Sequence, residues 1–127
     1  ESVRFYPLVS PTEAAILIAQ RHVGVISLTE ELYRYAYPSK TFAYLGAGIP
    51  VLAMVEAESE LAHEIAKRQV GVAIDWSLPR EQQLARLYEL CRLQADLRPH
   101  VLARSQDMFS RTLARERWLT AFDEAAK

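Results

Sequence analysis

The chain has 127 residues, of which 50% are apolar and 24% are charged, and its net charge is −1. This length predicts a single domain over residues 1–127, and the balance of apolar and charged residues excludes a disordered chain. A near-neutral charge is not the basic surface that nucleic-acid binding requires, so we expect no nucleic-acid partner. The single cysteine, Cys91, excludes a disulfide framework and a cysteine-based zinc site.

Patterns typical of strands and helices alternate along the first two thirds of the chain. Apolar runs rich in β-branched residues predict four short strands, at residues 3–9, 23–28, 51–55 and 70–74. Capping residues and helical periodicity predict helices at 11–20, 38–47 and 58–69, then at 80–94, 98–107 and 111–125. This order indicates an α/β fold: a Rossmann-like, three-layer parallel sheet of about four strands, with helices on both faces and C-terminal helices.

The most informative loop covers residues 29–37. It follows a predicted strand, where ligands bind in open parallel sheets, and it is longer than most such connections. The helix after it begins Pro38-Ser39-Lys40, and free N–H groups, a hydroxyl and an ammonium group suit an anion such as a diphosphate. In the alternative reading, Ser39 only caps the helix and Lys40 is solvated.

Residues 37–51 read Tyr-Pro-Ser-Lys-Thr-Phe-Ala-Tyr-Leu-Gly-Ala-Gly-Ile-Pro-Val. This run resembles the nucleotide-sugar signature of retaining glycosyltransferases with the GT-B fold, in family 4, and the flanking predicted strands and the last helix agree with it. The resemblance covers nearly the whole chain and implies the later part of a GT-B C-terminal domain. It further implies a hexosyltransferase-like enzyme of polysaccharide or glycoconjugate biosynthesis, with the isolated fragment inactive.

The resemblance also implies roles for individual residues. It assigns no catalytic residue within this chain, no metal and no other cofactor, because the nucleotide-diphosphate sugar is the substrate. The implied donor contacts are Ser39, Lys40 and Thr41 for the diphosphate, the main chain of Leu8 and Val9 for the base, and Tyr37 and Glu60 for the sugar.

One position departs from the family. Ala43 stands where the family has the Glu that holds the ribose hydroxyls, and an alanine side chain accepts no hydrogen bond. The loss would weaken donor binding about ten- to a hundredfold. Glu30 and Glu31 are candidate substitutes, unless they are merely exposed loop charges.

Because the ribose acid is missing, a degenerate, non-catalytic scaffold or interaction domain is the main alternative function. A flavodoxin-like regulatory module ranks third, because such a module usually has acidic residues at strand ends or a glycine-rich phosphate loop, and we find neither in the sequence.

The resemblance leaves out the N-terminal acceptor domain of a GT-B enzyme and the first strands of its C-terminal domain. We therefore expect that acceptor domain as a partner, and a free sheet edge through which two copies could form a homodimer. For the full-length protein the expected location is cytoplasmic, peripheral at the inner membrane surface.

Overall fold

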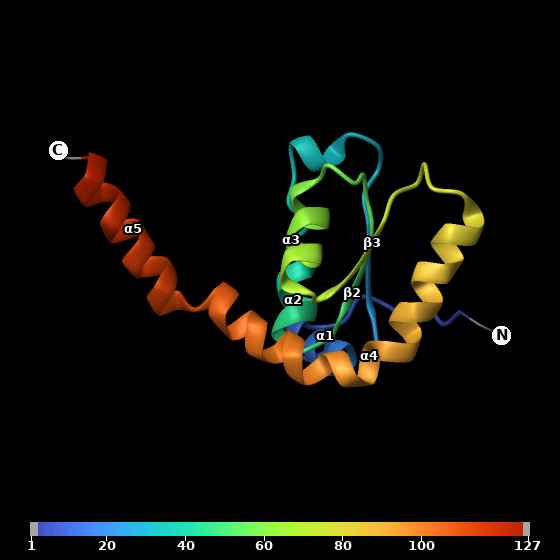
Figure 1. Cartoon of the computed structure of the whole chain (residues 1–127). Helices are drawn as coiled ribbons and strands as arrows, with labels where there is room; N and C mark the ends of the chain where they lie inside the picture. Colours follow the sequence, from blue (N-terminus) through green and yellow to red (C-terminus); the bar gives the residue numbers. More distant parts are fainter. Residues whose placement is uncertain (1–2, 126–127) are drawn as a thin grey trace.

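The computed structural model describes residues 3–125 and contains a three-stranded parallel sheet (Figure 1). Its strands are β1 (Gly24–Ser27), β2 (Val51–Met54) and β3 (Gly71–Ile74), in the order β1-β2-β3. The first residues of the three strands are paired with one another, so the strands start at the same level of the sheet with no register offset. The strands expected at 23–28, 51–55 and 70–74 are thus confirmed.

Helices cover both faces of the sheet. Helix α2 (Lys40–Gly46) connects β1 to β2, and α3 (Glu60–Arg68) connects β2 to β3. Both lie on one face, as expected when consecutive parallel strands are joined by crossovers of the same hand. The first half of α4 (Arg80–Phe109) packs on the other face, where Leu90 is 1% exposed. The α/β class and the layered arrangement are therefore shown.

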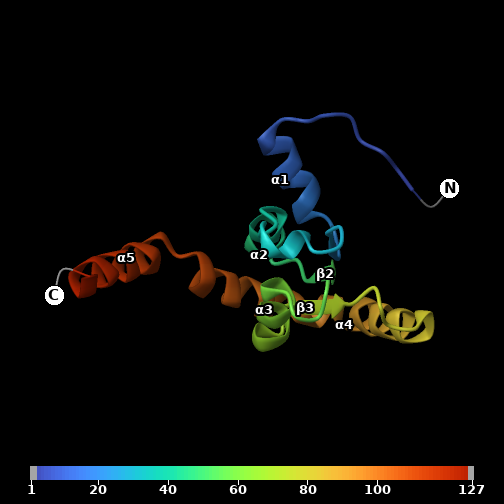
Figure 2. The ribbon, with the colours of Figure 1, turned by 90° about the horizontal axis from the view of Figure 1, so that it is seen from above.

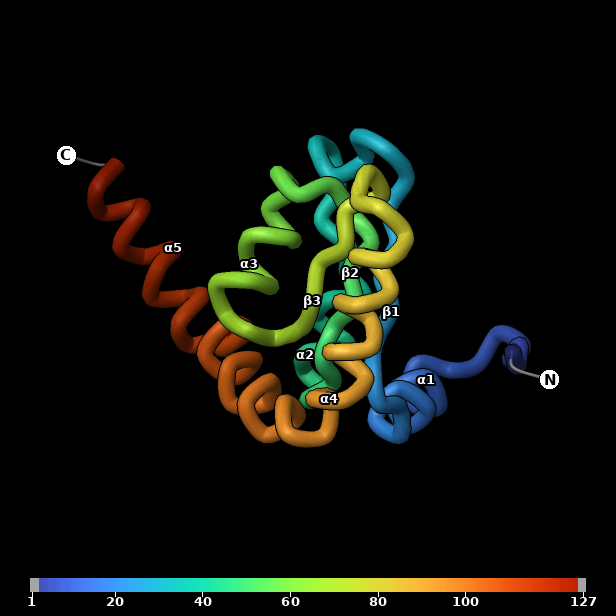
Figure 3. The backbone as a smooth tube through the Cα atoms, turned by 45° about the vertical axis from the view of Figure 1, so that its right-hand side comes forward, coloured from blue at the N-terminus to red at the C-terminus, as the bar shows by residue number. Residues whose placement is uncertain are grey.

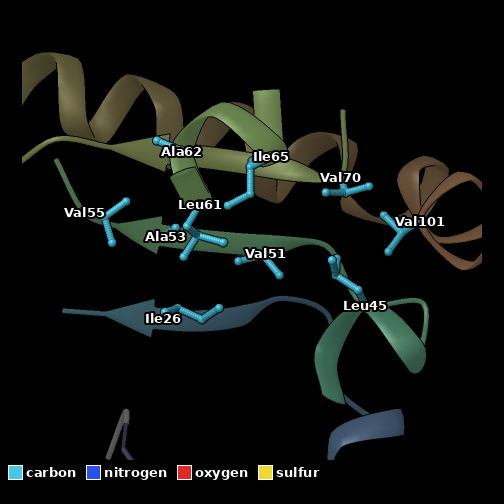
Figure 4. Packing of buried hydrophobic residues seen from close by; sticks show 10 residues of the cluster. All are labelled: Ile26, Leu45, Val51, Ala53, Val55, Leu61, Ala62, Ile65, Val70 and Val101. Carbon is cyan, nitrogen blue, oxygen red and sulfur yellow. The ribbon is translucent and has the colours of Figure 1, made fainter. Parts of the chain in front are cut away.

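The larger core cluster lies between the sheet and helices α2 and α3 (Figure 4). Strand β2 forms its centre, because the middle strand is covered on both faces, and three of its four residues are buried. Burial of one such side chain stabilises the fold by roughly 1.5–3 kcal/mol. The buried members of this cluster are Ile26, Leu45, Val51, Ala53, Val55, Leu61, Ala62, Ile65, Val70 and Val101.

Helix α4 is a single helix of 30 residues, although two separate helices are expected at 80–94 and 98–107. Pro99 lies inside it and removes one backbone hydrogen bond. The helix nevertheless continues, because Leu97 packs against both core clusters and Val101 is completely buried in the larger one. Figure 1 shows α4 curving around the lower end of the sheet, from one face to the other.

The strand expected at residues 3–9 is wrong, since this segment belongs to no strand. Most of its apolar side chains are exposed: Phe5 is 90% exposed and Leu8 is fully exposed. Pro7 also lacks the N–H group that a paired strand would donate. The sheet therefore has three strands within residues 3–125 instead of about four.

The remaining elements lie around this sheet. Helix α1 (Pro11–Ala19) begins with a capping box, in which Ser10 and Glu13 satisfy each other's backbone N–H groups. A short 3-10 turn, η1 (Leu32–Arg34), interrupts the loop after β1. Helix α5 (Arg111–Ala125) points away from the sheet in two views at right angles (Figures 1 and 2). None of the helices within residues 3–125 is sufficiently long and apolar to span a membrane.

Candidate functional site

The carboxyl ends of the three strands lie at one edge of the sheet, at the top of Figure 1. Three loops leave the sheet there, one after each strand, at residues 28–39, 55–59 and 75–79. Most of the residues expected to contact a ligand lie on these loops or at the starts of the helices that follow them. The carboxyl edge is therefore the candidate site.

Carboxylates in the loops after β2 and β3 join the three loops. Glu56 accepts a hydrogen bond of 2.6 Å from the Glu31 N–H, and Glu58 accepts one of 3.2 Å from the Tyr33 hydroxyl. Asp75 accepts a 2.8 Å bond from the Ala57 N–H. The expectation that acidic residues are missing at strand ends is thus wrong. The signal was present in the sequence, because Glu56 follows Val55 directly and Asp75 follows Ile74.

Hydrogen bonds also set the charge state of Asp75. The hydroxyl and the N–H of Ser77, followed by the Ala57 N–H, hold the pKa of this carboxyl below its usual value. These bonds favour the ionised form. Asp75 is therefore an anion that organises the backbone of two loops.

The start of α2 presents two uncommitted polar groups. The N-cap residue Ser39 is exposed and makes no side-chain capping bond, so the reading of Ser39 as a simple cap does not describe this helix. Lys40 is exposed, and no ion pair to it is found within residues 3–125. A hydroxyl and an ammonium group are therefore free at the same end of one helix.

Thr41, the third residue expected at the diphosphate, is oriented differently. Its side chain is 0% exposed, its hydroxyl has no hydrogen-bond partner among the described residues, and its N–H donates to the Pro38 carbonyl at 3.0 Å. Thr41 therefore faces the core and offers no group to a ligand in this conformation.

Tyr37 and Glu60, the residues expected beside the donor sugar, line one small cavity of about 190 Å³. Tyr37 lies in the loop after β1 and Glu60 is the first residue of α3, 23 positions later in the sequence. Arg34 and Tyr35 line the same cavity and supply a guanidinium group and a second phenol ring. Burial of Tyr37, together with the nearby carboxylates of Glu64 and Glu60, raises the pKa of its phenol, so it stays protonated and can donate a hydrogen bond.

A second, larger cavity of about 740 Å³ opens beside the first, and Leu28 lines both. This volume lies within the range of ligand pockets. Its polar groups are carboxylates and hydroxyls, and Trp76, which is 49% exposed, forms part of the wall. Glu30, one candidate substitute for the ribose acid, lines this cavity. The other, Glu31, uses its carboxylate in a 3.5 Å ion pair with Arg34.

Leu8 and Val9 are not part of this site. Tyr6, two residues earlier, accepts a 3.3 Å hydrogen bond from Arg21, which precedes β1 and therefore lies at its amino end. The segment that carries Leu8 and Val9 is held at the opposite end of the sheet from the cavities. The structure does not bring their main chain to the other expected donor contacts.

Ala43 is exposed on α2 and lines neither cavity. No group of three His, Cys, Asp or Glu side chains within residues 3–125 is arranged to hold a metal ion.

No family model matches the sequence, and neither a curated protein nor a solved structure matches it.

Proposed function

We propose that this chain is the donor-binding part of a retaining glycosyltransferase and binds a nucleotide-diphosphate sugar at the carboxyl edge of its sheet. The observation that carries the proposal is the grouping of free polar residues around the start of α2. Ser39 and Lys40 are exposed and uncommitted, and they directly follow Pro38, which lines the cavity that Tyr37 and Glu60 share. The resemblance of residues 37–51 to the family signature supports the same assignment.

The proposed chemistry follows from these groups. Transfer of the sugar leaves negative charge on the departing diphosphate, and a positioned cation stabilises that charge. The Lys40 ammonium would supply this stabilisation, and the free Ser39 hydroxyl would donate a hydrogen bond to the diphosphate. The Tyr37 phenol would donate to a sugar hydroxyl, and the Glu60 carboxylate would accept from one. The acceptor and the catalytic base would come from the other domain of the full enzyme.

The missing ribose acid is compatible with this proposal, because Glu30 lines the larger cavity beside the site. Its carboxylate can accept the two ribose hydroxyl hydrogen bonds that Ala43 cannot.

Ala43 also supports the second candidate function, a non-catalytic glycosyltransferase-like scaffold. The substitution Ala43→Glu separates the two. A large gain in nucleotide affinity indicates a site that has lost its ribose contact, whereas an unchanged affinity indicates that Glu30 already provides it.

Calorimetric titration of the chain with UDP, GDP and ADP tests the proposal. We expect one of the three to bind, and Lys40→Ala to weaken it about ten- to a hundredfold, because an interaction with a charged group is lost. The matched control is Lys67→Ala, which removes an exposed lysine from the end of α3 and should leave the affinity unchanged. Failure of all three nucleotides to bind, or equal binding by Lys40→Ala and the wild type, would contradict the proposal.

A further inference from the structure

Strand β3 forms one edge of the sheet, and no further strand pairs with it within residues 3–125. On its inner side, the carbonyls of Val70 and Ile74 accept hydrogen bonds of 3.0 and 3.1 Å from N–H groups in β2 and just after it. Backbone groups of successive residues in a strand point to opposite sides, so Gly71 and Ala73 direct their N–H and C=O groups away from β2. An edge of this kind is a template for another strand.

A groove of about 530 Å³ lies along this edge, and most of the residues that line it are apolar. It lies between the two helical layers, because α3 covers one face of β3 and α4 covers the other (Figure 3). Helix α3 contributes the small side chains of Ala62 and Ala66, and α4 contributes Arg86 and Glu89. The small side chains leave room for a neighbouring strand beside β3.

The charges of α4 are arranged along the same edge. The Arg86 guanidinium donates a 2.9 Å hydrogen bond to the Ala73 carbonyl, which fixes the level of Arg86 along the strand. Helix α4 starts near the carboxyl end of β3 and runs back toward its amino end (Figure 1). Glu89, about 4.5 Å further along the helix, therefore lies closer to the level of Gly71. Arg86 and Glu89 are both exposed and share one side of α4, because they are three positions apart.

We propose that β3 pairs antiparallel with β3 of a second copy of this chain, so that the two sheets become one. In this register, Gly71 exchanges both backbone hydrogen bonds with Ala73 of the partner subunit, and Ala73 does so with Gly71 of the partner subunit. A two-fold axis at Val72 generates both pairs, as an isologous interface requires. The same axis brings Arg86 to Glu89 of the partner subunit and Glu89 to Arg86 of the partner subunit, once Arg86 leaves the Ala73 carbonyl.

The surrounding charges are compatible with this pairing. On the same side of α4, Gln82 and Leu93 are the next residues before and after the charged pair and are uncharged, and Asp96 lies about 10 Å beyond Glu89. The other titratable residues of the groove, His63 and Asp75, are held by hydrogen bonds within their own subunit. The inference is independent of the proposed function, because the pairing uses no group of the donor site.

Sedimentation equilibrium of the full chain over a wide concentration range, with charge variants, tests this interface. We expect the wild type to dimerise. Arg86→Glu and Glu89→Arg each place like charges opposite one another in a homodimer, so each should lower the dimer affinity at least about tenfold. An equimolar mixture of the two variants should form a heterodimer, because both facing pairs are again opposite in charge. Recovery in the mixture shows that neither variant failed by misfolding.

Amide hydrogen exchange of the wild type locates the interface. The N–H groups of Gly71 and Ala73 face away from β2 and should exchange more slowly as the protein concentration rises and the dimer forms. The control variant is Arg104→Glu, which reverses an exposed charge on the second half of α4 and should leave dimerisation unchanged.

A wild type that stays monomeric at all concentrations overturns the proposal, and so does a mixture of the two variants that does not associate. A dimer in which the Gly71 and Ala73 amides gain no protection also overturns it and places the interface elsewhere, for example on the edge of β1.

Discussion

Replacement of Thr41 by valine should stabilise the protein. The side chain of Thr41 is 0% exposed, and its hydroxyl has no hydrogen-bond partner among the described residues. Valine has nearly the same shape and replaces the hydroxyl with a methyl group. The substitution removes a buried polar group without opening a cavity.

The size of the effect follows from the cost of an unpaired polar group. A buried donor or acceptor without a partner costs about 1–3 kcal/mol, which Thr41→Val should recover. For a domain of this length, the entropy of unfolding makes each 1 kcal/mol equivalent to about 4 °C in the melting temperature. An increase of about 4–12 °C is therefore expected. Two controls bracket the result. Thr41→Ser keeps the hydroxyl and loses the methyl group, so it should destabilise. Thr12→Val, on the exposed side of α1, should change stability by less than about 0.5 kcal/mol.

Thermal and urea unfolding, followed by circular dichroism, measure both the melting temperature and the free energy of unfolding. Thr41→Val should also keep the nucleotide affinity of the wild type, because the hydroxyl faces the core. A destabilised Thr41→Val would refute the reasoning, since it would show that the hydroxyl has a partner. Loss of nucleotide binding would show that the hydroxyl turns toward the ligand.

Three further substitutions test other features of the structure. A Cβ atom at Gly71 would overlap the Val51 backbone carbonyl, so Gly71→Ala should destabilise the protein by about 3 kcal/mol or more in a urea titration. A Cβ atom at Gly46 meets open space, so the control Gly46→Ala should be neutral or stabilise the protein by about 0.5 kcal/mol. Glu31 has a φ of 61°, so Glu31→Gly should relieve left-handed strain and raise stability by about 1 kcal/mol; a lower melting temperature would contradict this. The pKa of Asp75 is lowered in the folded state, so its contribution to stability is present above about pH 4 and is lost as the pH falls below that value. The free energies of unfolding of the wild type and Asp75→Asn should therefore differ at pH 7 and converge in acid.

Local signals predicted the central strands and most of the helices. At residues 70–74 the β-branched run, and at Ser10–Glu13 the capping box, show that a few neighbouring residues determine the local structure. The prediction of a strand at residues 3–9 failed because a strand also needs a neighbouring strand to pair with and a buried face, and both depend on distant parts of the chain. The expected break before Pro99 failed for a similar reason, since packing against two core clusters outweighs one lost hydrogen bond.

In the candidate site, too, local sequence patterns predict some features, and contacts between distant parts of the chain determine the others. The placement of Lys40 at a helix start could be read from the loop and capping pattern alone. That Tyr37 and Glu60 lie together was expected only through the family resemblance, because Tyr37 is in the loop after β1 and Glu60 is at the start of α3. The inward orientation of Thr41 could not be predicted, since it depends on how α2 rotates against the sheet. The bonds from Glu56 and Asp75 across loops likewise depend on the three-dimensional approach of those loops.

Titration of the isotope-labelled chain with UDP, GDP and ADP, followed by the amide chemical shifts of each residue, tests most directly whether the carboxyl edge binds a nucleotide diphosphate. We expect one nucleotide to produce saturable shifts at Ser39 and Lys40, at Tyr37 and Glu60, and in the loop that contains Glu30. The amides of α5 should be unaffected. Shifts confined to other parts of the molecule, or no saturable shift with any of the three nucleotides, would contradict a donor site at the start of α2.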